Sequence, residues 1–135
     1  MAITKAAGRQ TPLIANVDFT YADLTSGSAI EAIDLPPGAI VIGGYLNITT
    51  AFNSGTTDLL EIGDGADADK FVAGGADNGS TAQTVLFDVA AQWTEYTAKD
   101  TVDVTWTAVG TAATAGAATL VVEYIIDGRA CEVQE

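Results

Sequence analysis

From residue 15 onward the chain alternates between apolar and polar residues with a period of two, and turn signals interrupt the alternation at short intervals. In "NVDFTY" (16–21), Val17, Phe19 and Tyr21 alternate with polar residues, as in a half-buried strand. "TSGS" (25–28), "PPG" (36–38) and "NSGTT" (53–57) indicate turns, since Pro fixes φ and Gly permits positive φ. No long window has helical spacing, and "DVAAQ" (88–92) has room for one helical turn at most. The chain is therefore predicted to be all-β.

The alternation predicts about eight or nine short strands. Their expected ranges are 16–21, 29–35, 39–50, 58–64, 70–73, 83–89, 94–98, 101–107 and 118–127. Residues 99–100 are expected to form a tight hairpin between their two neighbouring strands. Gly43–Gly44 indicates a bulge or bend in 39–50, a range in which the apolar residues at 40, 42, 46 and 48 are expected to share one face. The last strand is apolar on both faces except for Glu123, so we expect it to be central.

Many short strands without intervening helices predict a two-sheet antiparallel β-sandwich. A jelly-roll-like arrangement fits the long connections best, and an immunoglobulin-like sandwich is the alternative. The residues expected to face the core include Phe19, Tyr21, Val85, Phe87, Val89, Val102, Val104 and Trp106. Acids at outward strand positions are expected to be solvated, and they include Asp18, Asp103 and Glu123.

Residues 1–14, "MAITKAAGRQTPLI", differ from the rest of the chain. Lys5 and Arg9 give this segment a charge of +2, which leaves −15 on residues 15–135 because the total is −13. The segment has too little apolar surface to fold by itself. We therefore expect residues 1–14 to form an extended N-terminal arm and residues 15–135 to form the β-sandwich domain.

The balance of 18 acidic and 5 basic residues limits the partners. A surface of this charge repels nucleic acid and anionic membranes, so neither is an expected partner. Cys131 is the single cysteine and excludes an intrachain disulfide. The sequence has no signal-peptide pattern and no apolar stretch that could span a membrane, so synthesis in a cytoplasm is expected.

The stretch "EIGDGADADKF" (61–71) is a candidate for calcium binding, because it holds four acids. However, Asp64, Asp67 and Asp69 lack the spacing of an EF-hand loop, and Lys70 stands where that loop has glycine. "GDG" is a good turn in which Asp64 can accept hydrogen bonds from the main chain. We expect a tight turn, with Asp64, Asp67 and Asp69 as weak metal candidates, and no cofactor.

No catalytic residues are predicted. The chain has no histidine, which excludes Ser-His-Asp and Cys-His arrangements. Paired carboxylates could in principle hydrolyse glycosides, but with 18 acids a close pair is uninformative. Sugar binding is a stronger alternative, since Trp93 and Tyr96 could stack on a pyranose ring. Trp93 lies outside a clear strand and is the best candidate for an exposed aromatic.

Residues 33–71 and 96–134 contain the phrases "TAFNSGTTD", "IGDGAD" and "VVEYIIDGRA". In these phrases the chain resembles small jelly-roll-type capsid decoration, or cement, proteins of tailed bacteriophages. The resemblance covers most of residues 15–134 and contains no catalytic signature. It implies a virion structural protein on the outer capsid surface that bridges neighbouring capsomers and stabilises the head.

The resemblance implies the major capsid protein as partner, and self-association as a homodimer or homotrimer would suit the symmetry of a capsid. It assigns no contact residues. From the residues themselves we expect the arm to make the capsid contact, with Lys5 and Arg9 as charge anchors and Ile3, Pro12 and Leu13 buried on docking. The alternatives are a glycan- or receptor-binding module of a phage head fibre or tail, and a calcium-dependent adhesion domain.

Overall fold

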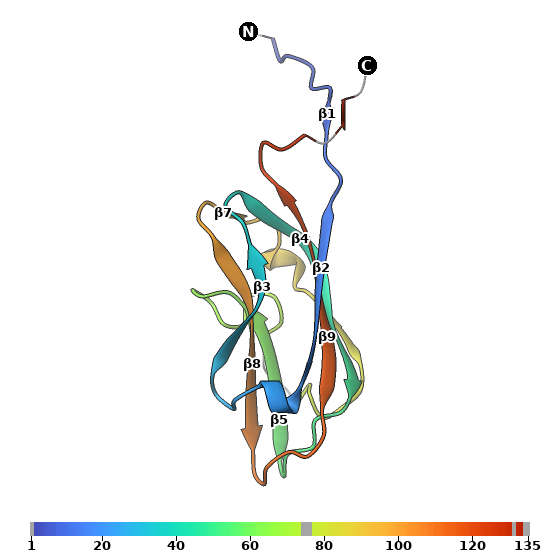
Figure 1. The fold of residues 1–135 in the computed structure, drawn as a ribbon, viewed down its shortest axis with the longest axis vertical. Helices are drawn as coiled ribbons and strands as arrows, with labels where there is room; N and C mark the ends of the chain where they lie inside the picture. Colours follow the sequence, from blue (N-terminus) through green and yellow to red (C-terminus); the bar gives the residue numbers. More distant parts are fainter. Residues whose placement is uncertain (1, 74–76, 131, 134–135) are drawn as a thin grey trace.

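The computed structural model describes residues 2–73, 77–130 and 132–133, and two antiparallel sheets pack face to face in it (Figure 1). The larger sheet has the strand order β2-β9-β4-β6, with β7 also paired to β4, and the smaller sheet has the order β3-β8-β5. The elements are β1 (Gly8–Arg9), β2 (Leu13–Thr20), η1 (Tyr21–Asp23), β3 (Ala29–Leu35), β4 (Ala39–Thr50), β5 (Thr57–Gly63), β6 (Thr84–Leu86), η2 (Val89–Ala91), β7 (Glu95–Tyr96), β8 (Asp100–Val109), β9 (Ala117–Ile126) and β10 (Glu132–Val133).

The order of the strands defines the fold as a jelly-roll-like sandwich. From β2 to β9 the chain changes sheet at every connection except the one between β6 and β7. An immunoglobulin-like sandwich instead joins several neighbouring strands within one sheet. The predicted jelly-roll-like sandwich is therefore confirmed, and the immunoglobulin-like alternative is wrong. In the described residues, no helix is long and apolar enough to cross a membrane.

The core lies between the two sheets, where alternate side chains of each strand meet. Phe19, Phe87 and Trp106 are buried as predicted, and Tyr21 is half-buried against the same cluster. Strand β9 lies between β2 and β4, which confirms its central position. The largest fully buried side chains are Phe52, Phe71, Leu35, Leu46, Ile48, Leu60, Ile62, Leu120, Val41, Val102, Val104 and Val122.

A bulge in β4 confirms the prediction made from Gly43–Gly44, but it also overturns the predicted face of this strand. The pairing with β9 shifts between Val41 and Gly43, so the buried side of β4 changes along the strand. Leu46 and Ile48 are buried after the bulge, whereas Ala39 and Val41 are buried before it. The isoleucines at 40 and 42 are only half-buried, so the expected common face is wrong.

A loop closes the outer edge of β5, where an eight-stranded jelly roll would have a further strand. The Asn78 side chain donates to the carbonyl of Leu60 and accepts from its amide, both at 2.8 Å. The amide of Gly79 donates to the carbonyl of Asp58. The strand predicted at 70–73 is wrong, because it is reduced to a single bridge between Val72 and Ile62. These bonds satisfy backbone groups at the edge of β5 that could otherwise pair with a strand of another molecule.

The expected hairpin at residues 99–100 is also wrong. Strand β7 pairs with β4 in the larger sheet, while β8 is the central strand of the smaller sheet. Lys99 therefore belongs to a connection that crosses from one sheet to the other. A hairpin within one sheet and a connection between two sheets give the same local alternation of apolar and polar residues, so the sequence could not distinguish them.

Substitution of the two glycines in the bulge should separate their roles. A methyl group at Gly44 would lie 2.6 Å from both the Phe87 ring and the carbonyl oxygen of Val121. At Gly43 the nearest atom is a carboxylate oxygen of Glu123 at 3.9 Å. We expect Gly44→Ala to lower the free energy of unfolding by about 1–3 kcal/mol or more.

The matched control is Gly43→Ala, which should change the free energy of unfolding by less than about 0.5 kcal/mol. Urea unfolding of both variants measures the difference. Equal effects would contradict the close packing of Phe87 over Gly44.

Candidate interaction surfaces

The acidic loop is a tight turn organised around Asp64. Its Oδ1 accepts from the amides of Ala66 at 2.9 Å and Asp67 at 2.8 Å. Its Oδ2 accepts from the Tyr96 hydroxyl at 2.7 Å and the Lys70 ammonium at 3.2 Å. Asp64 is 5% exposed, so these four bonds replace its water. The predicted turn, with Asp64 bonded to the main chain, is confirmed.

Asp64, Asp67 and Asp69 are not brought together as a set of metal ligands. In the parts of the chain that the structure describes, no three acidic, cysteine or histidine side chains are grouped so that they could hold a metal ion. Asp69 lies beside Asp67, and their hydrogen bond and like charges raise the pKa of Asp69. Both oxygens of Asp64 already serve the turn, so its carboxylate has a structural role.

Tyr96 connects the acidic loop to the larger sheet. It is buried, and it donates to Asp64, while the Lys70 ammonium lies 5.0 Å from the centre of its ring. Burial and the adjacent Asp64 carboxylate raise the pKa of Tyr96 well above its usual range. The expectation that Tyr96 could form an exposed platform is therefore wrong. Its hydrogen-bond partner Asp64 lies 32 residues earlier in the sequence, so local patterning could not reveal that Tyr96 is buried.

Asp103 was expected to be solvated, and this is also wrong. It lies on the central strand β8 opposite Glu31 and is buried. Burial raises the pKa of Asp103, the hydroxyl of Thr101 that donates at 2.6 Å opposes this, and the charges of Asp100 and Glu31 raise it further. The two flanking strands cover a position that alternation alone assigned to solvent.

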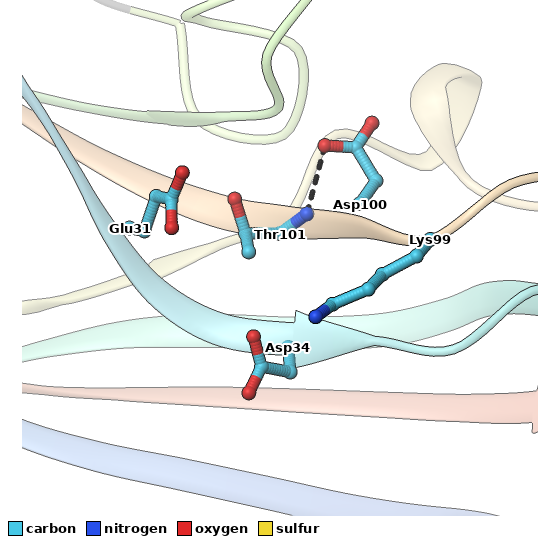
Figure 2. Close-up of a pocket in the computed structure, with 5 residues that line it drawn as sticks. All are labelled: Glu31, Asp34, Lys99, Asp100 and Thr101. Atoms are coloured by element: carbon cyan, nitrogen blue, oxygen red, sulfur yellow. Dashed lines mark hydrogen bonds between the residues drawn. The ribbon is translucent and has the colours of Figure 1, made fainter.

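A shallow depression of about 290 Å³ lies beside Asp103 in the smaller sheet (Figure 2). Glu31, Asp34, Lys99, Asp100 and Thr101 line it. The Asp100 carboxylate accepts from the amide of Thr101 at 2.7 Å, and Figure 2 shows Lys99 reaching towards Asp34. The lining is polar and predominantly acidic.

The N-terminal arm is tied to the sandwich at Gln10. The Gln10 amide donates to the carbonyls of Ile126 at 2.7 Å and Arg129 at 2.9 Å, and its oxygen accepts from the amide of Ile126 at 2.6 Å. Just before it, β1 pairs with β10, so these two short strands run side by side beyond the sandwich (Figure 1). Strand β2 begins at Leu13, so residues 13–14 lie in the larger sheet.

The predicted contact residues of the arm are spread along this extension. Ile3 is 95% exposed, and Lys5, Arg9 and Pro12 are exposed as well, whereas Leu13 is half-buried and paired with Tyr124. Residues 2–7 have no regular structure. The first four of these side chains are therefore available to a partner, and Leu13 already has a place in the sheet.

Trp93 is exposed as predicted, and three other exposed apolar side chains lie near the same margin of the larger sheet. Trp93 is 63% exposed, Leu86 and Val89 are each 74% exposed, and Tyr45 is 39% exposed. We call Tyr45, Leu86, Val89 and Trp93 the Trp93 surface. Tyr45 and Leu86 are direct partners across β4 and β6, and the amide of Trp93 donates to the carbonyl of Val41 on β4 at 2.8 Å.

Sequence alternation missed the exposure of Val89. It placed Val89 in a strand with Val85 and Phe87, but β6 ends at Leu86 and η2 begins at Val89. The Asp88 side chain accepts from the amide of Ala90 at 3.0 Å and caps this turn. An aspartate before "VAAQ" is a helix-start signal, and it could have identified the end of the strand.

Comparisons with known proteins give structural matches only. No family model matches the chain, and no curated protein matches its sequence. A chain in the capsid asymmetric unit of cyanophage Pam1 is similar, with a TM-score of 0.73 and 19% identity over 93% of this chain and 94% of that chain. A chain in the capsid of Ralstonia phage GP4 has a TM-score of 0.69 and 18% identity over 95% and 91%. A chain in the acid-stable capsid of Helicobacter pylori bacteriophage KHP30 has a TM-score of 0.65 and 16% identity over 85% and 87%. The fold is thus shared over most of the length of chains found in phage capsid structures.

Neutral substitutions of Asp64 and Asp103 should have opposite effects on stability. Burial alone would raise the pKa of Asp64, but its bonds from Tyr96, two amides and Lys70 outweigh this and lower it. At pH values above 3.8, the ordinary pKa of an aspartate, ionised Asp64 therefore stabilises the fold, and this contribution is lost as the pH falls below that value. Asp64→Asn should lower the free energy of unfolding at neutral pH by about 1–3 kcal/mol.

The pKa of Asp103 is raised, so its ionised form costs stability at neutral pH, and this cost disappears as the pH falls below 3.8. Asp103→Asn should therefore be more stable than the wild type at neutral pH, with the difference vanishing in acid. Urea unfolding at neutral pH and down to about pH 3 measures both variants. A loss of stability in both at neutral pH would contradict this account of Asp103.

Two truncations should separate the exposed part of the arm from the part that belongs to the fold. Removal of residues 1–7 should change the free energy of unfolding by less than about 0.5 kcal/mol, since residues 2–7 are exposed. Removal of residues 1–14 also removes the three Gln10 bonds and the start of β2, and should cost roughly 2–4 kcal/mol. Thermal and urea unfolding give the comparison, and equal stabilities would show that the Gln10 attachment is unimportant.

Proposed function

We propose that this chain is a phage virion structural protein that decorates the outside of the capsid and cements neighbouring capsomers. Its partner is the major capsid protein, and copies of the chain associate as a homodimer or homotrimer. It is made in the cytoplasm of the bacterial host and acts without a cofactor. In this proposal it has no enzymatic activity.

The observation that carries the proposal is the mutual coverage of the structural matches. Each match spans 85% or more of this chain and 87% or more of a chain from a phage capsid structure. The similar chains are therefore about as long as this one, and the likeness is not to one domain of a much larger protein.

The arm supports the docking part of the proposal. It carries Lys5 and Arg9 without an acid, and Figure 1 shows it extending beyond the sandwich. Ordering it on a partner costs roughly 1–2 kcal/mol per residue, so a stable contact has to bury Ile3 as well as pair the two cations. A shell offers many equivalent sites, and multivalent placement lets each contact be weak.

Binding of a glycan or receptor is the second candidate, and the exposed Trp93 favours it. An indole held on the surface can stack on a sugar ring. This candidate predicts retention on host polysaccharide, whereas the cement proposal predicts binding to phage heads. The two predictions differ in the material that retains the protein.

Cosedimentation with phage heads assembled without this protein tests the proposal. Full-length protein should bind saturably, and protein lacking residues 1–7 should bind at least about tenfold more weakly while remaining folded. Residues 1–7 are the suitable deletion because Gln10 and β2 stay in place. The decorated heads should also withstand more heat or osmotic shock than bare heads.

Binding that survives the deletion would keep the cement function and move the contact to the sandwich. Failure of full-length protein to bind heads would make the cement function wrong. Retention on host polysaccharide would then favour the glycan-binding candidate.

A further inference from the structure

The Trp93 surface gathers most of the exposed apolar side chains of the sandwich. Seven large apolar residues are exposed in the described parts of the chain, and four of them are Tyr45, Leu86, Val89 and Trp93. They lie along one margin of the larger sheet, because β6 and the backbone of Trp93 both bond to β4. Single exposed apolar residues need no explanation, but four of them along one margin of a sheet indicate an interaction surface.

The fold holds this surface in place. Phe87, between the exposed Leu86 and Asp88, is buried and stacks on Phe71 with ring centres 5.0 Å apart. The amide of Asp88 donates to the carbonyl of Phe71 at 2.8 Å. A buried aromatic anchor thus fixes the segment and directs its neighbours outward. A surface that is already ordered loses little entropy on binding.

Trp93 itself has an unfavourable backbone conformation. Its φ is 73°, and among the described residues with a side chain it is the one with positive φ. Such a conformation is unfavourable for a bulky residue, and it persists only where the surroundings impose it. A strained backbone that holds an indole on the surface indicates a binding role for Trp93, because tryptophan is enriched among the residues that dominate binding energy at interfaces.

The charges around the surface indicate the chemistry of its partner. Residues 84–96 contain Asp88 and Glu95 and no lysine or arginine. Asp127 lies beside Glu95 and raises the pKa of its carboxyl group. Two copies of the chain that met through this surface about a two-fold axis would bring acids towards acids. A partner with an apolar centre and a basic rim is complementary instead.

We propose that the Trp93 surface is a second capsid contact, separate from the arm, which docks on an apolar patch flanked by Lys or Arg on a shell subunit. This inference rests on the proposed function. A cement protein has to hold two subunits at once, so it needs two contacts. The arm extends beyond the sandwich from the start of β2 (Figure 1). The backbone of Trp93 bonds instead to β4, which is separated from β2 by β9 in the larger sheet. The two contacts can therefore reach different subunits.

The test uses variants of the full-length protein in the same cosedimentation with heads lacking it. Leu86→Ser combined with Val89→Ser removes two side chains that are 74% exposed, so folding should be unaffected. Trp93→Asn removes the indole, and asparagine tolerates positive φ. Each should weaken binding by about tenfold or more. The matched control is Val109→Ser at the end of β8, 48% exposed, which should bind like the wild type.

Thermal unfolding confirms that each variant is folded, and the Leu86/Val89 double variant remains decisive if Trp93→Asn is unstable. Glu95→Gln should also weaken binding at low salt, because a basic rim would lose its partner charge. Wild-type binding by the double variant, with binding lost on deletion of residues 1–7, would overturn this inference and leave the cement function standing.

Three other results would also count against the proposal. Absence of head binding by the wild-type protein would overturn both the function and this contact. A change in oligomeric mass of the double variant in sedimentation equilibrium, with head binding intact, would assign the surface to contacts between copies. Retention on host polysaccharide that Trp93→Asn abolishes would assign it to sugar binding.

Discussion

The contact between Gly44 and the ring of Phe87 is the constraint on which much of this molecule depends. Phe87 packs where a side chain at residue 44 would otherwise stand, and its amide donates to the Gly44 carbonyl at 3.1 Å. Its ring also stacks on Phe71, the last residue of the acidic stretch 61–71. One glycine thus lets a buried aromatic join β4, the acidic loop and the segment that ends at Trp93. Leu86 and the other side chains of the Trp93 surface are held in place because Phe87, next to Leu86 in the sequence, is buried in the core.

The same bulge explains why the sequence could predict strands better than faces. Period-two alternation identified most strands, and the glycine pair located the bulge. A bulge adds one residue to the pairing, so every side chain beyond it changes sides. Simple alternation therefore put Ile40 and Ile42 on the same face as Leu46 and Ile48, whereas Ala39 and Val41 are the residues buried before the bulge.

Errors at the candidate sites have a common cause in long-range partners. The Tyr96 hydroxyl can be buried because it donates a hydrogen bond to Asp64, 32 residues earlier. Asp103 is buried because β3 and β5 flank it on both sides. Neither of these long-range contacts can be inferred from the local sequence pattern. In contrast, the Asp64 turn and the exposure of Trp93 follow from adjacent residues, and both were predicted correctly. Local hydrogen bonds and turn residues can be read from a sequence, whereas burial of a polar group depends on the whole topology.

The two proposed contacts differ in physical character, and together they suit a protein that has to bridge. The arm is exposed and without regular structure at residues 2–7, so it can adapt to a neighbour at some distance but loses entropy when it is ordered. The Trp93 surface is held by Phe87 and by strained backbone, so it binds with little ordering cost but only where a partner already has the matching shape. Once the rigid surface is seated, the arm searches a volume limited by its own length, and its effective concentration at the neighbouring subunit is high. Weak arm contacts are then sufficient, because the first contact has already met the cost of bringing two molecules together.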